Sequence, residues 1–299
     1  MLETRELHPT LAREVIGLRL WEPLDEATVA ELRKLYANFG VLVFRRQVLS
    51  EAELSAFCGL LGTLELTVRS DWASPTAPEV TVLSNLKDGL GRAIGGLGDG
   101  ELEWHSDQSY MVEPATGAAL HAIELPPAGG ETFWLDLRAA YAKLPRNLRS
   151  QVTGKRGVFD YEKRLAGYGR ESDQNISDEA KRQTPAVTHA LVRAHPETGD
   201  RSLYLDSTTT TGIDYMDAAG GLALLDEIYA AATRDEFVYA HQWQVGDLVV
   251  WDNGFTMHRR TPFDPGARRL MKRMTMRLDR HRHVMPDGRP AQAEVGMPI

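Results

Sequence analysis

The chain has 299 residues, of which 42% are apolar and 25% are charged, and its formal net charge is −8. This composition is typical of a globular protein, and it excludes a disordered tail, a collagen and a disulfide-stapled scaffold. A net acidic chain is also a poor candidate for binding nucleic acid or membrane surfaces, because both require a basic face.

The N-terminal third predicts helices that alternate with strands. Amphipathic spacing and capping residues indicate helices over 25–39 and 50–61, and the second opens with a capping-box pattern. Short apolar runs indicate strands over 41–44 and 79–83. The segment 88–100 holds six glycines, which predicts a loop.

The rest of the chain is richer in strands. Apolar or alternating runs predict strands over 118–125, 132–135, 186–194, 237–241, 248–251, 257–261 and 270–278. Helices are expected over 136–144 and 216–232. The segment 160–183 is polar and has no clean period, so we expect an excursion there, either a lid or a mobile loop.

Many short strands with few helices predict a double-sheet fold that is mainly β with peripheral helices. No parallel βαβ alternation is visible in the pattern, and no linker divides the chain. We therefore expect a single domain over 1–299, with an inserted lid-like segment near 155–185.

Targeting signals are not expected. The first residues lack the apolar region of a secretory signal, and no stretch approaches the ~18 apolar residues of a membrane span. The only cysteine, Cys58, lies in an apolar run, so we expect a buried packing thiol. A chain that cannot form an intramolecular disulfide fits the reducing cytoplasm.

Two histidines and an aspartate carry the strongest chemical signal. His105 and Asp107 are two positions apart in an extended segment, so their side chains share one side and can aim at one point. His258, near the C-terminus, is the best candidate for a third metal ligand. Two imidazoles and one carboxylate leave three adjacent positions of an octahedral metal open, which suits Fe(II) in oxygen chemistry. The competing interpretation of His105 is a hydrogen-bonded or surface histidine.

The other histidines are interpreted as structural. His121 lies in an apolar strand and is expected to be a satisfied core residue. His189 and His195 have no carboxylate partner at ligand spacing. His281 and His283 follow the last predicted core strand in a basic segment, so we expect them in a solvated tail.

Several motifs occur together in a recognisable order. They are Trp104-His105-Ser106-Asp107, then 127–132, 246–253, His258 and 268–273, with a weaker match at 40–45. In this order and spacing, over about 15–278, the chain resembles the TauD/TfdA family of Fe(II)- and 2-oxoglutarate-dependent dioxygenases. One departure is Gly254, which stands where the family commonly has an arginine.

The resemblance implies a double-stranded β-helix (jelly-roll, cupin-like) core, with the His-X-Asp pair and the distal histidine as iron ligands. It also implies that Thr132 and Arg269 hold the distal carboxylate of 2-oxoglutarate, since a guanidinium grips a carboxylate bidentately. Arg273 shares a strand face with Arg269 and is placed to reach the same cavity. In family members its counterpart contacts an anionic group of the cosubstrate or the substrate.

The activity implied by the resemblance is oxidative. 2-Oxoglutarate is decarboxylated to succinate and CO2 as O2 is reduced, and an unactivated C–H of the substrate is oxidised, typically by hydroxylation. Asp107 argues against halogenation, because related halogenases replace this carboxylate with a small residue. The alternatives are desaturation or cyclisation by the same iron chemistry, a cupin-like isomerase or hydrolase that does not use 2-oxoglutarate, and a ligand-binding protein without activity.

The substrate expected is a small, anionic organic acid that bears a carboxylate. The resemblance and the pattern suggest four substrate contacts, at Arg69, Trp72, Asn85 and Tyr110. Taurine itself is not expected, because 64–72 lacks the histidine and tyrosine of taurine-cleaving members. In the insertion, residues such as Tyr161 and Arg164 are either ligand contacts or part of a solvated face. No nucleic-acid or membrane partner is expected, and a homodimer or homotetramer is compatible with the resemblance.

Overall fold

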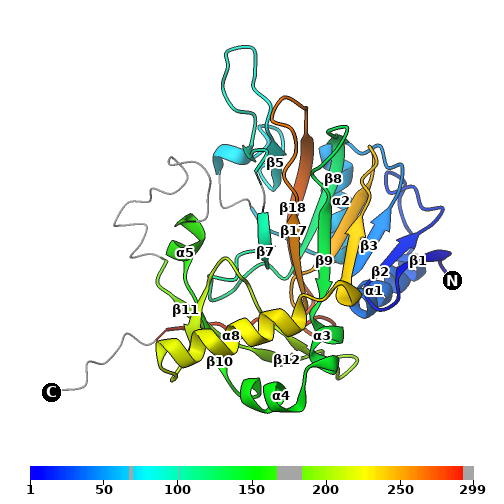
Figure 1. Ribbon diagram of the computed structural model, residues 1–299. Helices are drawn as coiled ribbons and strands as arrows, with labels where there is room; N and C mark the ends of the chain where they lie inside the picture. Colours follow the sequence, from blue (N-terminus) through cyan, green and yellow to red (C-terminus); the bar gives the residue numbers. More distant parts are fainter. Residues whose placement is uncertain (67–69, 101, 167–183, 292–299) are drawn as a thin grey trace.

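Two β-sheets lie face to face at the centre of the computed structural model, which describes residues 1–66, 70–100, 102–166 and 184–291 (Figure 1). The strands of the larger sheet are, in order, β1 (Thr4–His8), β2 (Ala12–Val15), β3 (Val41–Phe44), β16 (Leu248–Asp252), β8 (Gly117–Glu124), β18 (Leu270–Leu278), β5 (Val80–Ser84) and β6 (Gly96–Leu97), with β4 (Gly62–Leu64) also paired to β18. The smaller sheet runs β15 (Val238–His241), β9 (Thr132–Asp136), β17 (Thr256–Arg260) and β7 (Leu102–His105). The two sheets form the jelly-roll core that the resemblance implied.

Further elements lie around this core. A third sheet contains β14 (Thr210–Ile213), β10 (Arg156–Phe159), β11 (Val187–Ala190) and β19 (Arg289–Pro290), and β12 (Val192–Ala194) pairs with β13 (Arg201–Leu203). The helices are α1 (Glu26–Phe39), α2 (Glu51–Leu61), α3 (Leu137–Lys143), α4 (Arg146–Val152), α5 (Tyr161–Ala166) and α8 (Ala218–Ala232), with 3-10 turns η1 (Ser70–Trp72) and η2 (Asp235–Phe237). Among the described residues, no helix is long and apolar enough to cross a bilayer.

The apolar core fills the space between the two sheets. Trp134 and Tyr239 of the smaller sheet pack in one cluster with Leu120, Val249 and Trp251 of the larger sheet. This is the arrangement that alternating strands produce when the inward faces of two sheets interdigitate. The sheets are held apart by these large side chains, and the polar residues described below lie at the edge of this layer.

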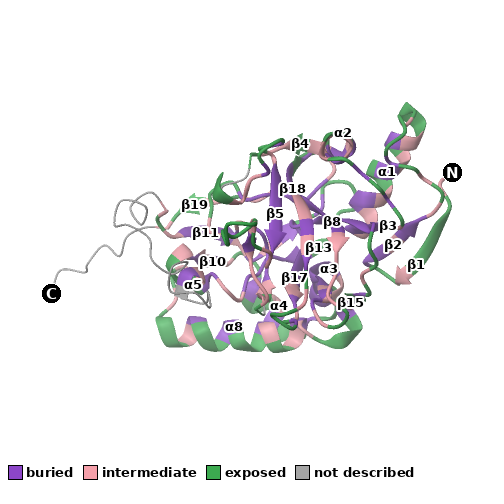
Figure 2. Ribbon diagram, turned by 90° about the horizontal axis from the view of Figure 1, so that it is seen from above, coloured by how far each residue is buried: buried purple, intermediate pink, exposed green. Residues whose placement is uncertain are grey.

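Helices cover the outer face of each sheet. α1 and α2 contribute Leu32, Tyr36 and Phe57 to a cluster with strand residues of the larger sheet. α3, α4 and α8 form a second cluster with Leu135 and Met257 of the smaller sheet. Figure 2 shows the result for α8, whose outer side is exposed while its inner side is buried. The helices therefore shield both sheets and leave the strand ends free to build a site.

The helix termini follow from local chemistry. Asp25 caps α1 by accepting the Thr28 N–H, and Gly40 ends it in a left-handed conformation with φ of 74°. A Cβ at position 40 would overlap the Phe255 ring, so glycine is also required by packing. In α2, Ser50 and Glu53 form the reciprocal capping box that was predicted.

Three expectations about the elements need correction. The glycine-rich loop contains β6, which pairs in parallel with β5, and the strand expected over 186–194 is divided into β11 and β12. A parallel βαβ unit is present, because β2 and β3 pair in parallel with α1 between them. The strands that were missed, β2 and β6, have four and two residues, which is too short for their pattern to be recognised in the sequence.

The expected insertion near 155–185 begins with regular structure. β10 pairs with both β11 and β14, and α5 follows it. The remainder, 167–183, lies outside the described residues, as does position 69.

Candidate active site

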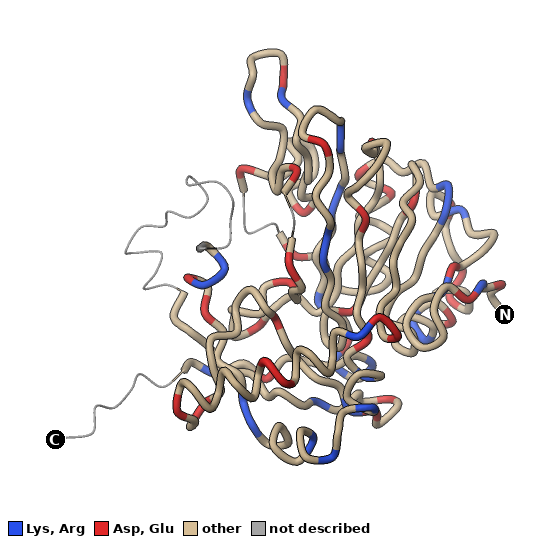
Figure 3. Tube along the Cα trace, in the orientation of Figure 1, with Lys and Arg blue, Asp and Glu red and all other residues tan. Residues whose placement is uncertain are grey.

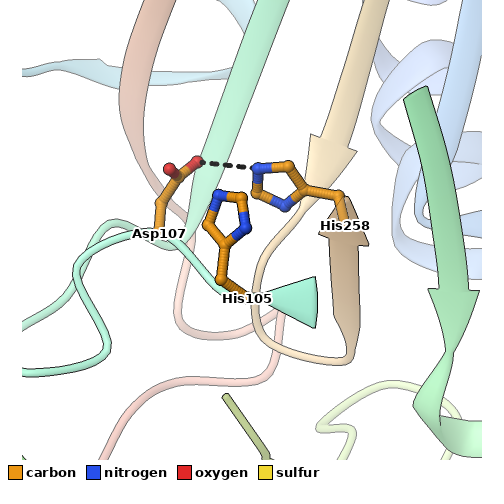
Figure 4. Close-up of side chains that lie close together, drawn as sticks. All are labelled: His105, Asp107 and His258. Carbon is orange, nitrogen blue, oxygen red and sulfur yellow. Dashed lines mark ion pairs between the residues drawn. The ribbon is translucent and has the colours of Figure 1, made fainter. Parts of the chain in front are cut away.

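The two histidines of the predicted triad meet across a strand pair. His105 ends β7 and is the direct partner of His258 on the neighbouring strand β17, and the ring centroids are 4.1 Å apart. Asp107 follows in the turn after β7, and its Oδ2 lies 3.9 Å from His258 Nε2 (Figure 4). One ligand atom from each of the three buried residues lies within 4.8 Å of the others. The structure thus brings His258 to a pair of residues, His105 and Asp107, that lies about 150 positions earlier in the sequence.

The hydrogen bonds of His105 define its tautomer. Its Nδ1 lies 2.7 Å from the Glu103 carbonyl oxygen, which can only accept, so Nδ1 carries the proton. The lone pair is therefore on Nε2, on the side of the ring away from Glu103. A metal-binding histidine is commonly oriented in this way by a backbone carbonyl. The Nδ1 of His258 is buried and has no hydrogen-bond partner among the residues that the structure describes.

Electrostatics prepare the three side chains for a cation. Burial, followed by the charge of Arg164, lowers the pKa of His105, while burial and the neighbouring His105 hold the pKa of His258 well below its usual range. Burial alone would raise the pKa of Asp107, but the charges of Arg273 and the two histidines outweigh it and lower that pKa. Near neutral pH the site presents two neutral imidazoles and a carboxylate, the donor set that a divalent transition metal takes.

Asp107 is held by two further residues. Its Oδ1 accepts a hydrogen bond of 3.1 Å from Arg273, and its Oδ2 accepts one of 3.4 Å from the Asn253 amide. The Oδ1 of Asn253 in turn accepts the Trp251 indole N–H at 3.0 Å. Asn253 stands in a segment that the sequence analysis used for the resemblance, but no role was predicted for it.

A cavity between the two sheets adjoins the triad. It is lined by both histidines together with Leu83, Leu97, Leu102, Leu120, Thr132, Trp251, Arg259, Arg260, Arg269 and Arg273. The three residues predicted to contact 2-oxoglutarate are all in this lining. Basic residues gather along β17 and β18, the strands that supply its arginines (Figure 3). The cavity is therefore strongly cationic at one end.

Arg269 is a buried cation with no counter-charge in the part of the chain that the structure describes. Arg269 is 2% exposed, and burial together with the charge of the neighbouring Arg260 lowers the pKa of its guanidinium to about 9. Among the described residues no carboxylate forms an ion pair with Arg269, and its Nε has no hydrogen-bond partner. Burying an unpaired charge is costly. The cavity is consequently suited to an anionic ligand.

Arg260 is a cavity residue that sequence reasoning missed. It pairs across the sheet with Thr132 and donates hydrogen bonds to the carbonyl oxygens of Leu97 and Gly100. Its position two residues after His258 places it on the same strand face, which is a signal that was available in the sequence.

Thr132 is oriented by a tryptophan. Trp243 donates its indole N–H to Thr132 Oγ1 at 3.0 Å. Because this bond occupies the hydroxyl as an acceptor, the hydroxyl proton of Thr132 is free to be donated to a ligand. Trp243 lies in the loop after β15 and carried no signal of this role in the sequence.

The described substrate candidates do not line the cavity. Trp72 packs flat against the backbone of β6, since a Cβ at Gly96 would overlap its ring. Tyr110 packs against Tyr161 of α5, with ring centroids 4.3 Å apart and an angle of 33° between the ring planes. Arg69 lies outside the described residues.

Asn85, which was predicted to contact the substrate, makes hydrogen bonds at both ends of its amide. Its Nδ2 donates to the carbonyl oxygens of Ala267, at 2.7 Å, and Pro265, at 3.2 Å. Its Oδ1 accepts the backbone N–H of Arg269 at 3.0 Å. With these bonds the amide is used on both ends, and it fixes the chain where Arg269 enters the cavity.

The segment after β18 folds back over the end of β16, so the expectation of a solvated tail is wrong for His283. This residue is 2% exposed, and its Nδ1 lies 2.7 Å from Asp252 Oδ2. The neighbouring Val284 explains Gly254, because a Cβ at position 254 would overlap the Val284 carbonyl oxygen. There is no room for the arginine that the family commonly has. His281 is exposed, as expected.

Two expectations about core residues are confirmed. His121 is 2% exposed, and its Nε2 lies 3.0 Å from the Gln47 carbonyl oxygen. Cys58 is buried, and burial raises the pKa of its thiol. A thiol that stays protonated and covered is a packing residue, as predicted.

Comparison with known proteins agrees with this geometry. Residues 3–275 match the model of the family described as "Taurine catabolism dioxygenase TauD, TfdA family". The chain is 36% identical to an alpha-ketoglutarate-dependent 2,4-dichlorophenoxyacetate dioxygenase of Cupriavidus pinatubonensis, over 90% of this chain and 95% of that enzyme. It is 30% identical to the pentalenolactone F synthase of Streptomyces avermitilis, over 89% of this chain and 90% of that enzyme.

Solved structures show the same likeness. The crystal structure of AAD-2 in complex with Mn(II) and N-oxalylglycine matches with a TM-score of 0.79 and 30% identity, covering 93% of this chain and 98% of that chain. A taurine dioxygenase from Burkholderia xenovorans matches with a TM-score of 0.77 and 29% identity, covering 99% of this chain and 96% of that one. The likeness therefore extends over nearly the whole fold.

Proposed function

Because the chain belongs to the TauD/TfdA family and is an Fe(II)- and 2-oxoglutarate-dependent dioxygenase, we propose that His105, Asp107 and His258 hold its iron. Bound iron supplies, with O2 and 2-oxoglutarate, the oxidising power needed to attack an unactivated C–H, and succinate and CO2 are released. The cupin-like isomerase or hydrolase considered above finds no support among the relatives, which are named as dioxygenases and a synthase.

The observation that carries the cosubstrate assignment is the buried guanidinium of Arg269, which no carboxylate of the described residues pairs with. We propose that it binds the distal carboxylate of 2-oxoglutarate, and that the Thr132 hydroxyl, with its proton left free by Trp243, donates to the same group. Arg260, on the strand beside Thr132, adds a second buried positive charge near this end of the cavity. Both arginines favour an anion over water at this position.

The substrate is proposed to be a small organic acid that carries a carboxylate. Relatives are named for 2,4-dichlorophenoxyacetate, (S)-phenoxypropionate and sulfate esters. In this chain, Arg273 contacts Asp107 directly. The charge of Arg164 on α5 also lowers the pKa of all three triad residues, next after burial at His105 and as a smaller contribution at Asp107 and His258. An anionic group between Arg164 and Arg273 would place the rest of the substrate beside the metal.

Hydroxylation is the outcome that we propose. The triad residues do not distinguish it from desaturation or cyclisation, because the outcome depends on which hydrogen of the substrate faces the metal. We further propose a single catalytic domain over 1–299, a cytoplasmic location, which agrees with the buried, unpaired Cys58, and a homodimer or homotetramer. Light scattering of the purified protein tests the last of these.

The experiment that tests the cosubstrate assignment is an anaerobic titration with Fe(II) and then 2-oxoglutarate. We expect the weak visible charge-transfer band of iron chelated by a 2-oxo acid to appear at one equivalent of each. A screen of organic acids, scored by succinate release, follows, with each acid compared with its neutral amide. Iron binding without the band would contradict the use of 2-oxoglutarate, and equal turnover of acids and amides would contradict the anionic substrate.

Replacing Trp243 with phenylalanine is expected to raise the KM for 2-oxoglutarate by a few-fold. Trp243→Phe removes the indole donor while keeping an aromatic ring, so the Thr132 hydroxyl loses the bond that orients it. A hydrogen bond of this kind contributes about 1 kcal/mol, which corresponds to a KM for 2-oxoglutarate raised about fivefold. The KM is measured at saturating Fe(II). An unchanged KM in a folded variant contradicts the orienting role of Trp243.

A further inference from the structure

Ser106, the residue between His105 and Asp107, is held by hydrogen bonds from both its backbone and its side chain. Ser106 is fully buried, at 0% exposure. Its backbone N–H donates to Asp206 Oδ2 at 3.1 Å, and its hydroxyl donates to the Asn253 carbonyl oxygen at 3.0 Å. Since Ser106 connects His105 to Asp107, whatever holds Ser106 also fixes the directions of both ligands.

Asp206, the partner of the Ser106 N–H, is itself held by several hydrogen bonds. It is 0% exposed, and each of its two carboxylate oxygens accepts two hydrogen bonds. Oδ1 accepts from the backbone N–H of Thr208 at 2.8 Å and from its hydroxyl at 2.7 Å. Oδ2 accepts from the backbone N–H of Ser106 at 3.1 Å and from the Ser109 hydroxyl at 2.6 Å. Each of the two oxygens accepts a backbone N–H, which can only donate, so neither position can hold an NH2 group. An amide of the same shape cannot replace it, because its NH2 would face a backbone N–H.

The same loop also anchors α5. Lys163 donates its Nζ to the Thr210 carbonyl oxygen at 2.6 Å, and Arg164 Nη1 lies 3.4 Å from Thr208 Oγ1. The Thr208 hydroxyl donates to Asp206, and Thr210 donates its own hydroxyl to the Asp206 carbonyl oxygen at 2.7 Å. The turn that carries two metal ligands and the helix that carries Arg164 are therefore joined through one buried carboxylate.

We propose that Asp206 is a positioning residue that sets the metal affinity of the site by fixing the His105–Asp107 turn. This inference rests on the proposed function, because it takes the triad as the metal site. Asp206 touches neither the triad side chains nor the cavity lining, and it acts through the Ser106 backbone and the Ser109 hydroxyl. Residues that orient metal ligands typically change metal affinity by about 10–100-fold when replaced.

The charge of Asp206 also affects the pKa of His105. Burial and Arg164 lower the pKa of His105, whereas the charges of Asp107 and Asp206 act in the opposite direction. This agrees with a short separation between Asp206 and the ligand turn, which the hydrogen bonds establish independently.

The test is a titration of the apoprotein with Mn(II), followed by the electron paramagnetic resonance signal of the free ion, well below the melting temperature of each variant. Asp206→Asn is expected to bind Mn(II) about 10–100-fold more weakly than the wild type. Ser109→Ala removes one of the four donors and leaves the carboxylate, so a smaller loss in the same direction is expected. If Asp206→Asn does not fold, Ser109→Ala alone decides the proposal.

Asp247→Asn is the matched control. Asp247 is also 0% exposed and accepts from Arg45 and the Gln244 N–H, and it contacts His241 of β15, the strand at the opposite edge of the smaller sheet from β7. We expect it to lose thermal stability and to keep its Mn(II) affinity within about twofold of the wild type. A shared loss of affinity in both aspartate variants would show a general effect of destabilisation and overturn the inference.

The outcomes separate this inference from the proposed function. If the wild type binds Mn(II), His258→Ala does not, and Asp206→Asn binds as the wild type does, the triad stands and the role of Asp206 is overturned. If the wild type and His258→Ala bind equally, the metal site is elsewhere, and both proposals are overturned.

Discussion

Replacing His105 with alanine is expected to lower succinate production by at least about three powers of ten, because a metal centre supplies several kcal/mol to the chemistry that it supports. His105 presents Nε2 to the site while Nδ1 is bound to the Glu103 carbonyl, and no other histidine among the described residues pairs with His258 across the strands. The measurement is succinate release at saturating Fe(II) and 2-oxoglutarate, with Mn(II) binding followed in parallel.

A buried histidine outside the site is the control for this variant. His121→Gln keeps a donor for the Gln47 carbonyl oxygen and lies in the larger sheet, so its turnover is expected to stay within a few-fold of the wild type. Turnover by folded His105→Ala at a tenth or more of the wild-type rate would refute the ligand role of His105. An equal loss in both variants would assign the effect to folding.

Local patterns in the sequence predicted the parts of the site that lie on one strand. His105 at the end of β7 and Asp107 in the turn after it direct their side chains to one point, and Arg269, directly before β18, and Arg273, on β18, both line the cavity. Each of these relations follows from the two-residue period of a strand. The roles of Thr132 and Arg269 toward 2-oxoglutarate came from the resemblance, and the structure supplies a physical reason in the absence of a carboxylate beside Arg269 among the described residues.

The contacts between distant segments were beyond any local pattern. Asp206 and Ser106 are 100 positions apart, and Trp243 and Thr132 are 111 apart. A period of two or of 3.6 residues says which side of an element a residue faces, but the partner that it meets depends on the order of strands in the sheets. For the same reason the burial of His283 was missed, since it depends on the return of the chain over β16.

Arg269→Met is expected to separate the binding of 2-oxoglutarate from the binding of iron. Losing one partner of a buried, hydrogen-bonded charge pair costs about 2–5 kcal/mol, which corresponds to a Kd for 2-oxoglutarate raised about 30-fold to several thousandfold. Mn(II) affinity should stay near the wild-type value, because Arg269 has no contact with the triad among its described interactions. Isothermal titration with each ligand measures both quantities.

The thermal stability of Arg269→Met carries the more specific expectation. Without ligand, the wild type buries a guanidinium that no described carboxylate balances, so methionine at this position should leave the melting temperature unchanged or raise it. A ligand that binds only the folded state stabilises it in proportion to the logarithm of its concentration over Kd, so 2-oxoglutarate should raise the melting temperature of the wild type and not that of the variant. Arg268→Met is the neighbouring control, since Arg268 is exposed and pairs with Glu124 on the surface. A variant that loses stability without ligand yet keeps its response to 2-oxoglutarate would show that Arg269 serves the fold and that the cosubstrate carboxylate binds elsewhere.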